Sequence, residues 1–243
     1  MLEQLAVFLD SIGIPKAAEQ VSFLFDPVNI PFAIWETLYA PLIATVLAYI
    51  IGLPLGVLLV TGEEGGIHPL PKAFMRVLNT VINLLRSIPF LILMVMVFPL
   101  SRLILGTTIG TMATIVPLTV AAAPYVARLV EASLREMDRG VIEAAQSMGC
   151  STWQIVTKVM LPECKPSLIN GATNAAITIL SYGAMAGNIG GGGLGAISLQ
   201  RGYQRNQVIV LYVAVIILGV LVQIIQSIGT ALSVKTDKRI THK

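Results

Sequence analysis

Five long apolar segments limit what this chain can fold into more than any other feature of its sequence. They cover residues 33–60, 77–100, 108–130, 167–189 and 207–233. A helix needs about 20 mostly apolar residues to cross a bilayer, and each segment reaches that length. With 55% hydrophobic residues, 12% charged residues and a mean hydropathy of +0.81, the composition lies outside the range of soluble proteins. The sequence therefore predicts a membrane protein with five transmembrane helices.

The pattern inside these segments favours helices over strands. None of them alternates apolar and polar residues as a transmembrane barrel requires, and helices satisfy their own backbone hydrogen bonds in lipid. We predict an all-α, polytopic helical bundle. Its expected parts are an external or interfacial N-terminal segment (1–31), a transmembrane domain (32–234) that includes a cytoplasmic hairpin (136–165), and a cytoplasmic tail (235–243).

Lysine and arginine residues are divided unequally between the connecting segments, which predicts the orientation. If the hairpin is cytoplasmic, eleven basic residues share its side: Lys72, Arg76, Arg128, Arg135, Arg139, Lys158, Lys165, Lys235, Lys238, Arg239 and Lys243. Four lie outside: Lys16, Arg102, Arg201 and Arg205. The N-terminus is then external and the C-terminus cytoplasmic. The net charge of +3 reflects this orientation, not affinity for nucleic acid.

The N-terminal segment carries two short apolar stripes at helical spacing. The first comprises Leu2, Leu5, Leu9 and Ile12, and the second begins with Ala17, Val21 and Leu24. We expect this segment to lie at the membrane interface or against the bundle. The alternative is a poorly ordered terminus.

The stretch EAAQSMGCSTWQIVTKVMLP (143–162) is the part of the middle of the chain that is not apolar throughout. Its first half predicts a helix with one apolar face, formed by Val141, Ala144, Ala145 and Met148. Gly149 predicts the end of that helix, and Ser151 with Gln154 has the spacing of a capping box that begins another. On the second helix one face is expected to hold Trp153, Val156 and Met160. We interpret this hairpin as a docking element outside the bilayer.

The hairpin resembles the signature of the permease subunits of ABC importers. That signature is EAAxxxG and, after nine intervening residues, an aliphatic residue, x, Leu and Pro. The matching positions are Glu143, Ala144, Ala145, Gly149, Leu161 and Pro162, while Val159 stands where the family usually has Ile. The resemblance implies a type I importer fold in which these residues and Trp153 couple to an ATPase. It further implies a homodimer, two separate ATPase subunits that hold ATP and Mg, and an external binding protein or lipoprotein.

Three further stretches narrow the resemblance to the permeases of methionine importers. They are RSIPFLIL (86–93), IVPLTVAAAPYVARLVE (115–131) and GGGGLG followed by RGYQR (190–205). The resemblance extends from about Trp35 to the end of the chain. It implies transport of L-methionine, with D-methionine left open, across a bacterial inner membrane.

The sequence contains no catalytic or cofactor-binding motif of its own. It lacks the GxxxxGK[ST] phosphate loop, so a partner or an ion gradient must supply energy. A GxGxxG pattern at Gly190, Gly192 and Gly195 follows a predicted span instead of a strand, which argues against dinucleotide binding and for a tight external turn. Two histidines (His68, His242) and two cysteines (Cys150, Cys164) give no metal-ligand cluster. We therefore expect neither an enzyme nor a bound cofactor.

Polar residues within the apolar segments are candidates for the translocation pathway. Asn79, Asn83 and Arg86 share one helical face, and we favour interhelical hydrogen bonds for the two asparagines. Asn170, Asn174, Ser181 and Met185 form a second stripe, for which a pathway and plain packing are equally supported. The pathway candidates are Arg86, Pro89, Asn174, Ser181 and Met185.

Two alternative functions stay open. One is an ABC permease of the same architecture for another small solute. The other is a gradient-driven carrier, which needs an intramembrane carboxylate to couple an ion. Glu36, at the outer end of the first segment, is the single candidate for that role.

Overall fold

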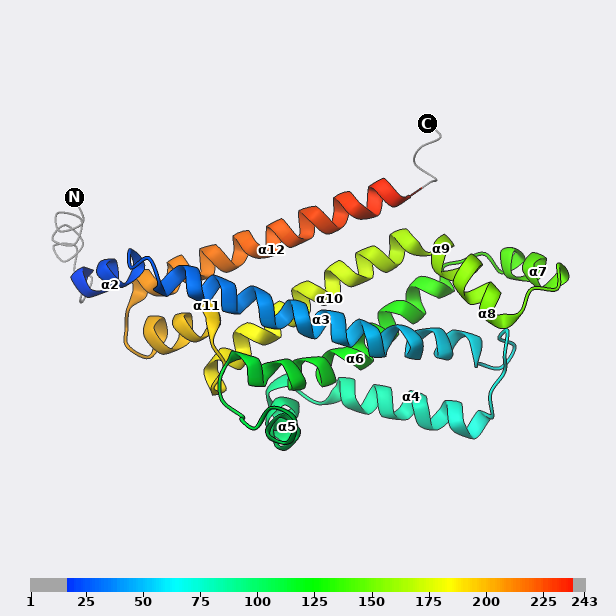
Figure 1. Ribbon diagram of the computed structural model, residues 1–243, viewed down its shortest axis with the longest axis horizontal. Coiled ribbons are helices and arrows are strands. Elements are labelled where there is room, and N and C mark those ends of the chain that lie inside the picture. Colours follow the sequence, from blue (N-terminus) through cyan, green and yellow to red (C-terminus); the bar gives the residue numbers. More distant parts are fainter. Residues whose placement is uncertain (1–16, 238–243) are drawn as a thin grey trace. The chain divides into compact units, whose positions relative to one another are not determined.

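The computed structural model describes residues 17–237, and throughout this range the chain forms helices and no β-strand, as predicted. Figure 1 shows the helices in chain order. They are α2 (Ala17–Leu24), α3 (Asn29–Thr61), α4 (Lys72–Ser87), α5 (Phe90–Leu105), α6 (Thr111–Arg135), α7 (Arg139–Ser147), α8 (Thr152–Gln154), α9 (Leu161–Glu163), α10 (Lys165–Ala186), α11 (Gly193–Ala196) and α12 (Val208–Thr236). Two π-helical stretches, Ile155–Met160 and Ile197–Tyr203, and a 3-10 turn, Gly187–Ile189, connect them.

Three of the described helices, α3, α6 and α12, are long and apolar enough to cross a membrane. The span predicted over 77–100 is not one continuous helix, because the chain bends by 110° between α4 and α5. Ile88 takes an extended conformation (φ −77°, ψ 128°), as expected for a residue that precedes proline. The broken pair would make a fourth span, and α10 is a continuous helix of 22 residues that carries several polar side chains. The number of five spans stays a prediction.

The described residues divide into two compact units. The first comprises 17–44, 90–118 and 178–224, and the second comprises 45–89, 119–177 and 225–237. The units do not coincide with the three parts expected from the sequence, which stay a prediction.

The core of the first unit forms where α3, α11 and α12 meet. Ala33, Leu194 and Ala214 are buried together, with Ile34 and Ile197 packed around them. The glycine-rich segment makes the tight turn expected of it: Gly190 and Gly193 have φ of +103° and +83°, a conformation that L side chains rarely adopt.

Helix α2 packs on the first unit through its second predicted stripe. Ala17 and Val21 are buried, and buried Gln20 accepts a hydrogen bond through Oε1 from the backbone N–H of Ile209 (2.9 Å). The ring of Phe23 lies beneath the Arg201 guanidinium, 4.0 Å from its centroid. Of the two alternatives for the N-terminal segment, packing against the bundle is confirmed for α2. The stripe of Leu2, Leu5, Leu9 and Ile12 lies outside the described residues.

The core of the second unit joins α3, α4 and α6. Leu59, Met75, Ile82 and Ala127 form its buried cluster. Close approach of α3 to α6 depends on glycine, because a Cβ on Gly56 would lie 2.6 Å from both the Ala127 carbonyl oxygen and the Val130 Cβ. Helix α6, which belongs to this core, leads at its C-terminus into the hairpin.

Candidate functional site

The first arm of the hairpin is α7, and local hydrogen bonds define both of its ends. The Asp138 carboxylate accepts from the Gly140 N–H (2.8 Å) at the N-terminus. At the C-terminus the N–H groups of Gly149 and Cys150 donate to the carbonyls of Gln146 (2.9 Å) and Ala145 (3.1 Å). With Gly149 at φ +78°, this is a Schellman motif, and the predicted stop is confirmed.

The second arm begins with the predicted capping box. The Ser151 N–H donates to Gln154 Oε1 (2.8 Å), and the Gln154 N–H donates to Ser151 Oγ (3.4 Å). The arm then widens into a π-helix, so the α-helical period does not hold along it. The shared face predicted for Trp153, Val156 and Met160 is therefore wrong: Val156 and Met160 are buried, whereas Trp153 is 75% exposed.

Large apolar side chains are exposed on both arms of the hairpin, whose helices α7 and α8 are labelled in Figure 1. Val141 is 41% exposed and Met148 76%, beside exposed Glu143 and Gly149. We call Val141, Glu143, Met148, Gly149 and Trp153 the docking corner. Ala145 is the buried residue of α7. The other predicted coupling residues lie around the corner and along the second arm: Ala144 and Pro162 are exposed, while Val159 and Leu161 are half-buried.

Such a corner has the composition of a protein interface. Aromatic residues and methionine are enriched at interfaces, and apolar groups of this size gain free energy when a partner removes them from water. No atom of the described residues 17–237 outside the immediate neighbours comes within 4 Å of a Cβ added at Gly149, so the surface there is open. The geometry can therefore receive the surface of another protein.

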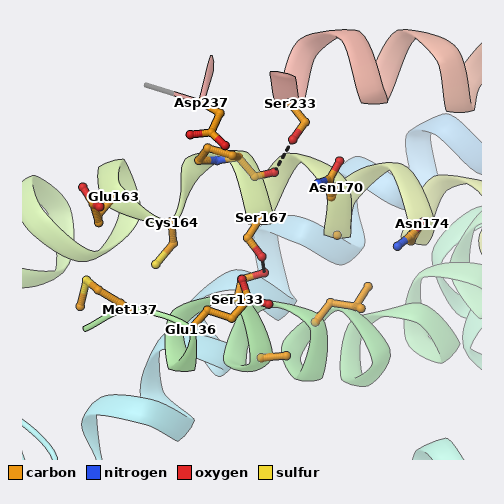
Figure 2. Close-up of a pocket in the computed structure, with 14 residues that line it drawn as sticks. Ser133, Glu136, Met137, Glu163, Cys164, Ser167, Asn170, Asn174, Ser233 and Asp237 are labelled. Carbon is orange, nitrogen blue, oxygen red and sulfur yellow. Dashed lines mark hydrogen bonds between the residues drawn. The ribbon is translucent and has the colours of Figure 1, made fainter. Parts of the chain in front are cut away.

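The first part of the polar stripe on α10 lines a cavity in the second unit. Asn170 and Asn174 are exposed and line a cavity of about 490 Å³ with residues of α6, α9 and α12. Figure 2 shows the labelled side chains around it, with carboxylates from Glu136, Glu163 and Asp237.

Two serine hydrogen bonds connect the walls of this cavity (Figure 2). Ser167 of α10 donates to Ser133 of α6 (3.0 Å), and Ser233 of α12 donates to the Pro166 carbonyl (2.9 Å). Behind the wall, the Tyr49 hydroxyl is buried without a hydrogen-bond partner among the described residues, and it lies 3.6 Å from the position of a Cβ on Gly171. The polar lining and the volume of the cavity leave room for water molecules with hydrogen-bond partners.

The predicted pathway residues are not gathered in one place. Asn174 lines the cavity, while exposed Arg86 and Pro89 do not. Ser181 and Met185 continue the exposed face of α10 in the first unit. Their role in transport stays a prediction.

The asparagines on α4 make the interhelical hydrogen bonds expected of them. Arg128 of α6 donates through Nη2 to Asn79 Oδ1 (2.8 Å) and to Asn83 Oδ1 (2.9 Å). Arg128, Glu131 and Arg135 follow one another at i, i+3 and i+7 along α6, and Glu131 bonds to both arginines. This helical spacing is the signal by which the charged cluster could have been found, although the sequence analysis missed it.

Glu36 holds the glycine-rich turn of the first unit. Its Oε1 accepts from Thr111 Oγ1 (2.6 Å) and its Oε2 from the Gly193 N–H (2.9 Å). The neighbouring Thr37 Oγ1 accepts from the Leu194 N–H (2.8 Å). Both carboxylate oxygens are therefore used in the structure, which favours a structural role over ion coupling. Across the described part of the chain no three His, Cys, Asp or Glu side chains are grouped to hold a metal.

Comparison with known proteins relates this geometry to membrane transport. Residues 52–233 match the family described as binding-protein-dependent transport system inner membrane component. The probable D-methionine transport system permease protein MetI of Vibrio cholerae is 50% identical over 208 residues, covering 85% of this chain and 92% of the relative. The D-methionine transport system permease protein MetI of Escherichia coli K12 is 47% identical over 154 residues, covering 63% and 70%.

A solved structure of an inward-facing MetNI methionine ABC transporter has the same fold. It superposes with a TM-score of 0.84 at 42% identity, covering 86% of this chain and 96% of the matched chain. The predicted type I importer permease fold is thereby confirmed.

Proposed function

Since the chain belongs to the family of binding-protein-dependent transport system inner membrane components, we propose that it is the permease subunit of an ATP-driven importer that carries methionine into the cytoplasm. The chain is a transport component and not an enzyme. ATP and Mg act on separate ATPase subunits. The complex comprises two copies of this chain, two ATPase subunits and an external methionine-binding protein or lipoprotein, embedded in lipid and without nucleic acid.

The docking corner is the observation that carries this proposal. It exposes apolar side chains on the EAA-type hairpin, where a coupling surface is expected, and its backbone leaves room for a partner. ATP binding draws the two ATPases together, and the two hairpins follow. The permeases then open outward, and hydrolysis resets them.

The distribution of basic residues supports the proposed orientation. Among the described residues, the basic side chains expected on the cytoplasmic side all belong to the second unit, and Arg102, Arg201 and Arg205 all belong to the first. The docking corner belongs to the second unit, with the larger basic set. This agrees with an external N-terminus and a cytoplasmic C-terminus.

The substrate assignment rests on the relatives, whose names specify D-methionine or methionine. We propose L-methionine and D-methionine as substrates. The polar cavity next to α10 gives the charged ends of an amino acid hydrogen-bonding groups on the cytoplasmic side, including Asn170, Asn174 and Glu136. An importer of the same architecture for another small solute is the alternative.

Uptake of labelled methionine into proteoliposomes tests the function. The chain is reconstituted with the ATPase and the binding protein from its own source, with and without ATP on the ATPase side. We expect accumulation only with ATP. Accumulation driven by an ion gradient alone would refute the proposal, and ATP hydrolysis without methionine uptake would refute the substrate.

A pair of glycine variants tests the docking corner. Gly149 and Gly106 both have positive φ (+78° and +75°), and both have open space around an added Cβ. Gly149→Trp and Gly106→Trp therefore impose the same backbone strain, but only Gly149 lies at the corner. We expect Gly149→Trp to abolish ATPase association or coupled uptake and Gly106→Trp to retain both. Equal behaviour of the two variants would refute the docking assignment.

A further inference from the structure

A buried carboxylate at the base of the hairpin is bonded to two arginines. Glu131 is 9% exposed, the lowest value among the acidic residues that the structure describes. Its Oε2 accepts from Arg128 Nη1 (2.6 Å), and its Oε1 accepts from Arg135 Nη2 (2.9 Å) and Nε (3.1 Å). These are charge-assisted hydrogen bonds with well-defined geometry.

Both arginines extend the network to other segments of the second unit. Arg128 bonds to Asn79 and Asn83 on α4, as described above. Arg135 bonds to both oxygens of Glu63, in the connection after α3, at 3.0 and 2.6 Å. A bidentate pair fixes the orientation of both groups. The network therefore joins α4, α6 and the end of α3.

The same network borders the first arm of the hairpin. Glu63 and Arg135 line a cavity of about 220 Å³ together with Arg139, Glu143 and Gln146 of α7. Glu143 belongs to the docking corner, so one end of the network and one coupling residue share the walls of one cavity.

Stability alone is a poor explanation for such a network. Desolvation offsets much of the attraction within the largely buried Arg128–Glu131 pair, and apolar replacements of similar volume are often as stable. The Arg135–Glu63 pair is partly exposed, and such pairs contribute little free energy. Fixed orientation is what a directional charged network provides and an apolar cluster does not.

We propose that Glu63 and Glu131 are positioning residues, which fix α4 and the end of α3 to α6 so that a displacement of the hairpin moves them as one body. This inference rests on the proposed function, because the displacement comes from the ATPase. Without the network, α7 would move, but α3 and α4 would not follow it. ATP would then be hydrolysed without a corresponding movement of methionine.

An adjacent residue provides a matched control. Glu64 pairs with Lys72 at 2.7 Å, but both side chains are about three-quarters exposed (76% and 75%). Such a surface pair contributes little. Glu63→Gln and Glu64→Gln remove one negative charge each at neighbouring positions, and only Glu63 belongs to the network.

The test measures methionine imported per ATP hydrolysed in proteoliposomes of the whole complex. We expect this ratio to fall about five-fold or more in Glu63→Gln and Glu131→Gln, since coupled sites ordinarily change each other's affinity by at least this factor. The ratio should be unchanged in Glu64→Gln. A merely structural role would lower uptake and hydrolysis in proportion and leave the ratio constant, which would overturn the proposal. Glu63 is half-exposed, so its variant keeps the test valid if Glu131→Gln does not fold.

The outcome with the unaltered chain separates the two hypotheses. If unaltered protein does not import methionine with ATP, the proposed function fails. If it does and Glu63→Gln imports as much methionine per ATP, the function stands and the positioning role is refuted.

Discussion

Substitutions of Glu36 are expected to give different results if its carboxylate has a structural role than if it couples an ion to transport. Its carboxylate accepts two hydrogen bonds, from Thr111 and Gly193, and so ties α3 to the start of α6 and to the glycine-rich turn. Hydrogen bonds to a charged group contribute about 1.5–3 kcal/mol each. Because Glu36 is half-buried, we take the lower end and expect Glu36→Ala to lower the free energy of unfolding by about 3 kcal/mol.

Glutamine is the informative comparison at this position. Its amide oxygen can accept from the Gly193 N–H, and its amide nitrogen can donate to the Thr111 hydroxyl oxygen, so both contacts survive without the charge. We expect Glu36→Gln to lose about 1 kcal/mol or less. Denaturant titration in detergent measures both variants, and the fluorescence of neighbouring Trp35 reports on this part of the first unit.

Two results would refute this reasoning. If glutamine destabilises the protein as much as alanine does, the negative charge and not the hydrogen-bond geometry holds the turn. If Glu36→Gln folds normally but no longer transports methionine with ATP, the carboxylate takes part in transport, as a gradient-driven carrier requires.

Four further variants test packing and pathway. Gly56→Ala should destabilise the second unit by about 1–3 kcal/mol, because the added Cβ meets the backbone of α6. Gly219→Ala has open space around the added Cβ and should stabilise α12 by about 0.5–1 kcal/mol. Unfolding in detergent compares the two variants. Gln20→Ala should release α2 at a cost of about 1–3 kcal/mol, measured as faster amide exchange at the start of α12, and unchanged exchange would contradict the buried contact. Ser181→Leu combined with Met185→Ala should change the kinetics of uptake without changing assembly, and unaltered kinetics would indicate plain packing.

Local features of the hairpin could be predicted because neighbouring residues determine them. Ser151 and Gln154 are three positions apart, and Gly149 ends α7 through bonds to residues of the preceding turn. The exposure of Trp153 could not be predicted, because the α-helical period assumed for the arm does not hold where it widens into a π-helix after this residue. Pro89 stands in the sequence, but the span was placed over it because the mostly apolar segment after it continues to residue 100.

The charged contacts between distant residues could not be predicted from the sequence. Glu36 and Gly193 are 157 positions apart, and Arg135 and Glu63 are 72 apart. Helical spacing can place Arg128, Glu131 and Arg135 on one face, but it does not say which distant carboxylate or amide meets them. Only the packing of α3 and α4 on α6 brings Glu63 and the asparagines to that face.

The two helix caps at the turn of the hairpin affect both the affinity and the rate with which this surface can bind a partner. The Schellman motif that ends α7 and the capping box that begins α8 satisfy the backbone of the turn between them without help from a partner. A binding surface that is already shaped does not have to lose conformational entropy on association, so more of the contact free energy appears as affinity. It also binds without a preceding folding step, which keeps association fast. Under the proposed function, a contact of this kind can transmit the movement of an ATPase subunit without first having to fold.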